Sequence, residues 1–233
     1  MVRIFGMEPN RTQNSRFCLH RLSSRRTVFW LAALLSFPVN ASGDYTKIAN
    51  NGTVLAADAK LGNGATDWAC TRDDATGLVW EIKTTDGGLR DRKHTYTWFN
   101  ADPAANGGSA GFYGTDTCGG TLSAYKNQCN TTHYFAAINA AALCGYTDWR
   151  LPQPEELRLL VDYGREGGPS PIDPAYFPNP AGPFYWTVSA AVGLYLDTWY
   201  FNADETQGGG CGSGPKQGVY SVQLVRGGKN KFK

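Results

Sequence analysis

Histidine is scarce in this chain, and sequence patterns typical of hydrolases and zinc sites are few. Only three histidines occur in 233 residues, and the sequence contains neither a His-Glu-x-x-His nor a Cys-x-x-Cys pair. The adjacent carboxylates Asp73–Asp74 and Glu155–Glu156 are poor acid/base pairs, because neighbouring side chains point apart and Glu155–Glu156 suits the first turn of a helix. We therefore expect no catalytic residue, no metal and no cofactor.

Long apolar runs are also few. Residues 28–37 form one, six arginines precede it, and Val39-Asn40-Ala41 supplies the small residues that a signal peptidase accepts. The run is short for a bilayer span. This pattern predicts a signal peptide over residues 1–41 with cleavage near Ala41, a periplasmic or extracellular location, and no membrane span after cleavage. The alternative is an amphipathic helix or an uncleaved anchor, and translation could begin at Met7 or later.

The excess of positive charge belongs to this leader. The whole chain has 22 Lys and Arg against 20 Asp and Glu. Without the six leader arginines and Glu8, 16 remain against 19, a formal charge of −3. A domain with this balance is a poor binder of polyanions, so we expect no nucleic acid as a partner.

Five cysteines remain after the predicted cleavage. Cys118 and Cys129 bracket a short polar loop and are the best candidates for one disulfide. Cys70 precedes a predicted strand and Cys144 ends a predicted helix, so a second bond would join those elements, leaving Cys211 unpaired. The alternative use of these thiols is a metal site with Cys129 and His133 one helical turn apart, but the spacings do not match the usual zinc patterns.

Glycine and asparagine divide the rest of the chain. Residues 42–69 are predicted to be extended, and residues 76–83 alternate as a strand with Leu78, Trp80 and Ile82 on one face. A long polar excursion over residues 84–129 indicates a disulfide-pinned insertion, either functional or structural. Helices are predicted at about 132–143, stopping before Gly145, and from Pro154 to about residue 161. Strands are expected at 184–189, 198–202 and 219–226, before a basic tail at 229–233.

Four motifs in order carry a resemblance to a known family: Thr76–Glu81, Tyr146–Pro152 with Glu156-Leu157, Tyr185–Ser189 and Val225–Gly228. Over about residues 70–228 the chain resembles the Lcl C-terminal domain family, a domain of unknown function named after a collagen-like bacterial adhesin. The Arg-Leu-Pro-x-x-x-Glu element and the terminal Val-Arg strand are also similar to C-type-lectin-like and formylglycine-generating-enzyme domains. The resemblance implies an α+β fold: a mixed, mostly antiparallel twisted sheet with two helices and long disulfide-pinned loops.

The resemblance says less about function. The adhesin that names the family binds sulfated glycosaminoglycans, but this chain lacks its collagen-like tract. Oxidase chemistry of the formylglycine-generating type needs a late cysteine pair, and only Cys211 lies late. Calcium sites of sugar-binding lectins use Trp-Asn-Asp, which is missing, and Gln153-Pro154-Glu155 falls at a helix start. A metal-independent site is therefore expected.

Cations and aromatics of one loop, with an acidic residue of a second loop, form the candidate ligand site: Arg90, Arg92, Lys93, His94, Tyr96 and Asp204. The alternative is a solvated hairpin with Tyr96 and Trp98 packed beneath it. Structural roles are expected for residues in a single core or in partly buried ion pairs: Trp80, Trp149, Arg150, Trp186, Trp199 and Arg226.

The sequence thus favours an exported, non-enzymatic binding module that recognises a glycan or a partner on the cell envelope or surface. A structural or assembly domain of an envelope protein, without a small-ligand site, is the alternative.

Overall fold

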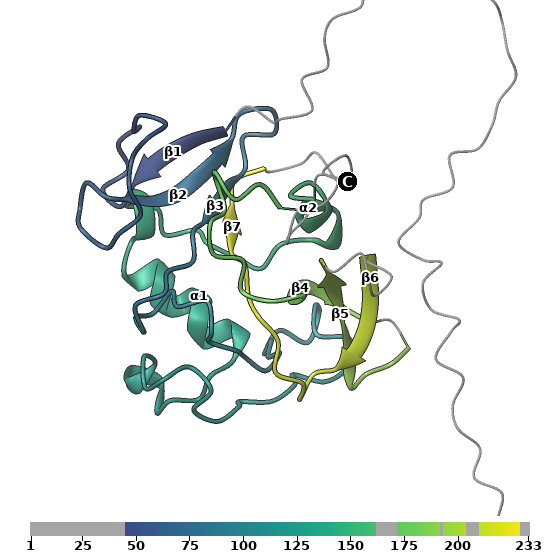
Figure 1. The fold of residues 1–233 in the computed structure, drawn as a ribbon. Helices are drawn as coiled ribbons and strands as arrows, with labels where there is room; N and C mark the ends of the chain where they lie inside the picture. The colour runs from purple at the N-terminus through teal and green to yellow at the C-terminus, as the bar shows by residue number, and fades with distance from the viewer. Residues whose placement is uncertain (1–44, 162–171, 192, 204–209, 229–233) are drawn as a thin grey trace, which may run out of the picture.

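A computed structural model describes residues 45–161, 172–191, 193–203 and 210–228 (Figure 1). Its elements are two antiparallel sheets, two α-helices and two short 3-10 turns, so the predicted α+β class is confirmed. The elements run in the order β1 (Tyr45–Ala49), β2 (Trp68–Asp73), β3 (Val79–Glu81), η1 (Ser123–Tyr125), α1 (Thr131–Ala140), η2 (Leu143–Gly145), α2 (Pro154–Arg158), β4 (Phe184–Ala190), β5 (Asp197–Asn202), β6 (Gly210–Pro215) and β7 (Val225–Arg226).

The predicted single sheet is in fact two. The first has the strand order β1-β2-β3-β7, so the last strand of the chain closes the edge beside β3. The second is the β4-β5-β6 meander. Figure 1 shows α1 beside the first sheet and α2 between the two sheets. Among the described residues, no helix is long and apolar enough to cross a membrane.

Three strands were not predicted. β1 and the first two residues of β2 lie in the segment expected to be a polar extended leader, yet the two strands pair over five positions. β6 reads Gly-Cys-Gly-Ser-Gly-Pro, a composition depleted in strands. It forms because the Tyr200 ring lies over it: a Cβ at Gly212 would come within 2.7 Å of that ring. Glycine is needed at this position so that the ring can pack on the strand. The glycine-rich composition therefore does not exclude a strand here.

The two helices begin within one residue of their predicted starts. The Asn130 side chain accepts a hydrogen bond from the His133 backbone N–H and starts α1. α1 ends at Ala140, earlier than expected, because Ala142 and Cys144 adopt left-handed backbone conformations before Gly145. At α2 the Glu156 carboxylate accepts the Gln153 N–H at 2.8 Å.

The predicted single tryptophan core is wrong. β3 is buried on both faces, so its alternating side chains enter two separate clusters. Trp149 and Trp186 belong to the first, together with Trp98, while Trp80 belongs to the second with Leu78 and Ile82. Trp199 is only half-buried on β5. The shared face of Leu78, Trp80 and Ile82 is confirmed.

Both expected arginine pairs are present. Arg150 contacts the Glu156 carboxylate with two nitrogens at 2.7 Å each and also donates to the Gly227 carbonyl at 3.1 Å. Arg226 contacts both carboxylate oxygens of Asp148, at 2.8 and 3.0 Å, and lies over the Tyr146 ring. Together these contacts attach α2 and β7 to the Trp149 segment.

Two predicted disulfides are confirmed. Cys70–Cys144 joins β2 to η2 with a Cα–Cα distance of 6.5 Å, and Cys118–Cys129 closes the insertion loop at 6.0 Å. The expectation of an unpaired Cys211 is wrong, because Cys211 is disulfide-bonded.

Candidate functional site

Arg90, the centre of the predicted ligand loop, is a structural clamp. Its guanidinium is buried and donates to the carbonyls of Ile82 at 2.7 Å, Gly62 at 3.0 Å and Ala69 at 3.1 Å, and to the Asn63 side chain at 2.8 Å. Burial lowers its pKa, and the carbonyl oxygens replace the water it loses. The guanidinium is thus committed to structural contacts, and its geometry does not support the predicted ligand role of Arg90.

The other predicted ligand residues are separated by burial. His94 is buried and its Nε2 lies 2.9 Å from the Gly88 carbonyl, while Tyr96 is buried against Tyr134. Only Arg92 and Lys93 are exposed. The alternative, a solvated hairpin with Tyr96 and Trp98 packed beneath it, therefore describes this loop. The remaining candidate, Asp204, lies outside the described residues.

A buried polar cluster lies under the first sheet. Lys83 Nζ lies 2.5 Å from a Glu81 oxygen and 2.8 Å from the Tyr134 hydroxyl, which itself donates to Glu81 at 2.7 Å. Glu81 also accepts the Leu224 backbone N–H. Burial lowers the pKa of Lys83, with the Glu81 charge opposing, and raises the pKa of Tyr134. Glu81 satisfies both neighbours, so the cluster locks β3 to α1 and the last segment of the chain.

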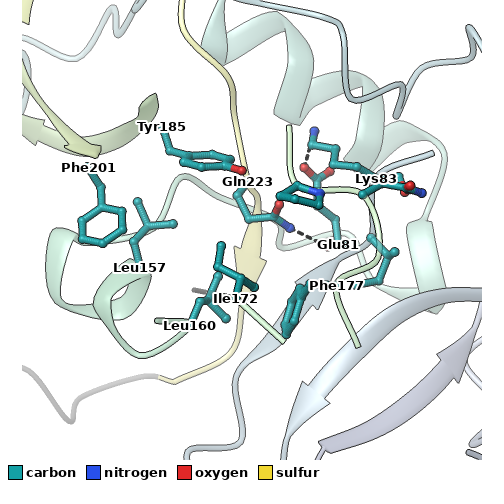
Figure 2. Close-up of a pocket in the computed structure, with 12 residues that line it drawn as sticks. Glu81, Lys83, Leu157, Leu160, Ile172, Phe177, Tyr185, Phe201 and Gln223 are labelled. Atoms are coloured by element: carbon teal, nitrogen blue, oxygen red, sulfur yellow. Dashed lines mark hydrogen bonds and ion pairs between the residues drawn. The ribbon is translucent and has the colours of Figure 1, made fainter. Parts of the chain in front are cut away.

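The cavity beside this cluster is too small for a sugar (Figure 2). Its walls are mainly apolar, from Leu157, Leu160, Ile172 and Phe177, with Glu81, Lys83 and Gln223 at the polar end. The space that a water centre can occupy is about 20 Å³, enough for about one or two waters. The cavity is thus a packing gap of the second core cluster.

A serine pattern in the insertion is also structural. Residues Gly107–Gly111 spell the Gly-x-Ser-x-Gly pattern of a nucleophile elbow, although no catalytic residue was expected from the sequence. Such an elbow connects a strand to a helix. Here turns surround Ser109, and its carbonyl accepts from buried Lys216 at 2.8 Å. Lys216 Nζ also donates to the carbonyls of Asn106 and Tyr195, over the Trp98 ring.

Four stacked rings, three on the insertion and one on α1, are the best candidate for a binding surface. We call them the aromatic row: Phe99, Tyr113, His133 and Tyr125. Phe99 and Tyr113 stack with centroids 4.4 Å apart, Tyr113 and His133 lie 6.2 Å apart at 29°, and His133 and Tyr125 stack at 4.6 Å. Phe99 is buried and anchors the row, while Tyr113 is 55% exposed. His133 and Tyr125 are half-buried.

Local structure holds these rings in place. The Cys118–Cys129 bond closes the loop that carries Tyr125 in η1. Asn130 donates to the Tyr113 carbonyl at 3.0 Å and lies 2.9 Å from His133 Nδ1. The loop returns through two non-glycine residues in the left-handed region, Lys126 and Asn127. Strained backbone of this kind concentrates at functional loops.

Hydrogen-bonding groups accompany the rings. Among the described residues, the hydroxyls of Tyr113 and Tyr125 form no hydrogen bond with the protein. Asp116 is exposed and caps the turn at Gly120 through one oxygen at 2.9 Å. Asp116 lies near Cys118 and Cys129, but a disulfide leaves no thiolate for a metal, so this group is not a metal site. The row offers apolar faces bordered by polar atoms.

The row was missed because its members are far apart in sequence. The sequence predicted that residues 84–129 form an insertion, either functional or structural. The candidate ligand residues chosen within it were mostly its cations. Phe112-Tyr113 and Tyr125 were available as a signal, since large aromatics in a polar, disulfide-closed loop need a reason to be there. What the sequence could not show is that His133, on α1, lies between them.

The comparison with known families agrees with this fold. The family model of the Lcl C-terminal domain matches residues 69–226, from β2 to β7. The chain belongs to this family. The searches of curated proteins and of solved structures find no match. The Lcl C-terminal domain of this chain thus starts at β2, and β1 extends its first sheet by one strand upstream. The family name assigns no reaction and no ligand.

Proposed function

We propose that this Lcl C-terminal domain is an exported, non-enzymatic module that binds a glycan on the aromatic row. The observation that carries the proposal is the row itself: one exposed ring, Tyr113, and two half-buried rings, fixed by a disulfide and by the Asn130 contacts. Its two tyrosine hydroxyls form no hydrogen bond among the described residues. Rigid aromatic side chains give a large contact area at a low cost in conformational entropy. Their flat faces suit the C–H face of a pyranose ring, and their hydroxyls suit its substituents.

The buried polar side chains all make structural contacts, and this supports a binding role rather than a catalytic one. Glu81, Lys83 and Tyr134 satisfy one another, Arg90 is held by carbonyls, and Lys216 is held by three more. A general acid or base must reach a substrate, and each of these groups is enclosed. The exposed groups on the loop of the row are the Asp116 carboxylate, the Lys126 ammonium and the tyrosine hydroxyls, all of which can hydrogen-bond a sugar.

The disulfides support export. Cys70–Cys144 and Cys118–Cys129 are both fully buried, and bonds of this kind persist in oxidising compartments such as the periplasm or the extracellular space. The signal peptide that would direct the chain there falls at residues 1–41, outside the described residues. Export places the row where glycans of the envelope or of a host surface are encountered.

A glycan array with the purified, oxidised mature protein tests the proposal. We expect binding to a subset of glycans that Tyr113→Ala reduces by about tenfold, since truncating a central aromatic contact commonly costs more than 1 kcal/mol. The matched control is Tyr195→Ala, which removes an equally exposed tyrosine (61%) from the β4–β5 connection. Absence of glycan binding by the wild type, or equal loss in both variants, would favour the structural or assembly alternative.

A further inference from the structure

His133 differs from the tyrosines of the aromatic row, because its contacts fix which ring nitrogen is available to a ligand. Its Nδ1 lies 2.9 Å from the Gln128 carbonyl oxygen and 2.9 Å from the Asn130 side-chain nitrogen. The orientation of the Asn130 amide is set, since its oxygen accepts the His133 backbone N–H at 2.9 Å. One neighbour of Nδ1 is therefore an acceptor and the other a donor, and the position of the ring hydrogen decides which of them is used.

The hydrogen-bond balance of this group places the ring hydrogen on Nδ1. The Asn130 amide has two N–H groups, and two carbonyls accept them, that of Tyr113 at 3.0 Å and that of Gln128 at 3.2 Å. With its hydrogen on Nδ1, the ring also donates to Gln128, whose oxygen has two lone pairs, and every donor is paired. A bare Nδ1 would instead take an amide hydrogen from one carbonyl and would face the Gln128 oxygen lone pair to lone pair. Neutral His133 thus leaves Nε2 without a hydrogen.

The bare Nε2 faces solvent. His133 is half-buried, and its hydrogen bonds to the described part of the chain involve its backbone N–H and Nδ1. Within that part, the buried side-chain nitrogens and oxygens without a partner belong to Trp80, Tyr96 and Asn127. Nε2 is not buried in this way, so it is open to water and to a ligand.

We propose that His133 Nε2 is the atom by which the aromatic row selects its glycan, accepting a hydrogen bond from a free sugar hydroxyl. This inference rests on the proposed function and adds a chemical requirement that the ligand must meet. The imidazole stacks with the rings of Tyr113 and Tyr125, so Nε2 belongs to the same row as the faces that would hold the sugar. The two tyrosine hydroxyls both donate and accept, and they tolerate any sugar oxygen. A bare imidazole nitrogen only accepts, and an O-methylated or O-sulfated position has no hydrogen to give it.

Chemical modification tests the open Nε2 without a glycan. Diethyl pyrocarbonate transfers its ethoxycarbonyl group to an accessible imidazole nitrogen that bears no hydrogen. His94 and His133 are the two histidines of residues 42–233, and His94 is the internal control, because it is buried with Nε2 2.9 Å from the Gly88 carbonyl. In the oxidised mature protein at about pH 8, where histidine is ordinarily neutral, His133 should react at least about tenfold faster, since a buried ring reacts only when its surroundings open. Equal rates, measured by peptide mass mapping, would refute an open Nε2.

Nuclear magnetic resonance reads the position of the hydrogen directly. Long-range proton–nitrogen spectra of the imidazole distinguish a nitrogen that bears a hydrogen from one that does not. At the same pH we expect the His133 hydrogen on Nδ1, and the Nε2 resonance should shift when the glycan that binds most tightly on the array is added. A hydrogen on Nε2 in the free protein would overturn the proposal.

Three variants at His133 test the contact with that same array glycan. His133→Phe keeps a ring in the row but removes both nitrogens, and it should raise Kd by about three- to tenfold, the size of one hydrogen bond. His133→Gln, whose side-chain amide reaches about as far as Nε2, should bind more tightly than His133→Asn, whose amide reaches only about as far as Nδ1. The start of α1 uses the backbone N–H of this residue, so each variant keeps it, and circular dichroism confirms the fold.

The outcomes separate this inference from the proposed function. A glycan that His133→Phe binds as tightly as the wild type, but that Tyr113→Ala does not bind, keeps the glycan-binding function and refutes the role of Nε2. Equal loss in His133→Gln and His133→Asn also refutes it. Absence of glycan binding by the wild type refutes the proposed function and this inference with it, while the modification of His133 still reports whether Nε2 is open.

Discussion

Replacing Arg150 by alanine should destabilise the fold strongly, because it leaves the Glu156 carboxylate buried without its cation. The Glu156 side chain is 2% exposed, and Arg150 contacts each of its two carboxylate oxygens at 2.7 Å. Breaking a fully buried pair costs about 3–5 kcal/mol. Arg150 itself is 38% exposed, so water can replace part of the contact, and we expect about 2–3 kcal/mol.

A double-mutant cycle with Glu156→Gln isolates the pair. Urea unfolding of the oxidised protein, followed by tryptophan fluorescence, gives the free energy of each variant. We expect the double variant to be less destabilised than the sum of the single variants by more than about 1 kcal/mol, since the residues interact directly. Arg226→Ala is the matched control, because its partner Asp148 is 48% exposed and such pairs contribute about 1 kcal/mol or less. Additive effects, or a smaller cost for Arg150→Ala than for Arg226→Ala, would refute the reasoning.

Two further predictions concern other polar side chains. Lys216→Met removes the ammonium donor from three carbonyls, of which only that of Asn106 keeps another donor, the Ser109 N–H, so it should cost about 2–3 kcal/mol. It should also speed amide exchange in residues 100–111 and 193–196. Exposed Lys126→Met should change stability by less than about 0.5 kcal/mol, and equal exchange in both variants would contradict this reasoning. The pKa of Asp86 is held below its usual value, chiefly by the Gly88 N–H, so its stabilising contribution is complete above the unfolded pKa and is lost as pH falls through the folded value. The stability difference between wild type and Asp86→Asn, from urea unfolding at pH 6 down to about 2, should therefore shrink with acid; a constant difference would argue against it.

Local patterns predicted the elements whose signals are local. The starts of both helices, the common face of Leu78, Trp80 and Ile82, and two disulfides follow from residues near one another or from simple spacing. The Arg150 and Arg226 pairs also followed, since an arginine flanked by apolar residues needs a partner. In each case residues close in the sequence indicate the structural feature.

The features that sequence did not reveal depend on distant contacts. β6 is stable because Tyr200 covers its glycines, and nothing within β6 indicates that ring. Arg90 is buried because Gly62, Ala69 and Ile82 converge on it, while its own polar neighbours suggested a solvated loop. The aromatic row likewise combines residues that are consecutive only in space.

Lys216 has a consequence for where this domain can work. Three converging carbonyl oxygens resemble the donors of a bound metal cation, yet the cation here is covalently part of the chain. A tethered ammonium has a very high effective concentration and cannot be removed by dilution or by chelators. The two loops it joins therefore keep their positions whatever the supply of divalent ions around the domain. The cost is a sensitivity to base, because burial lowers the pKa of this lysine and strongly alkaline conditions would remove the charge that holds the loops together.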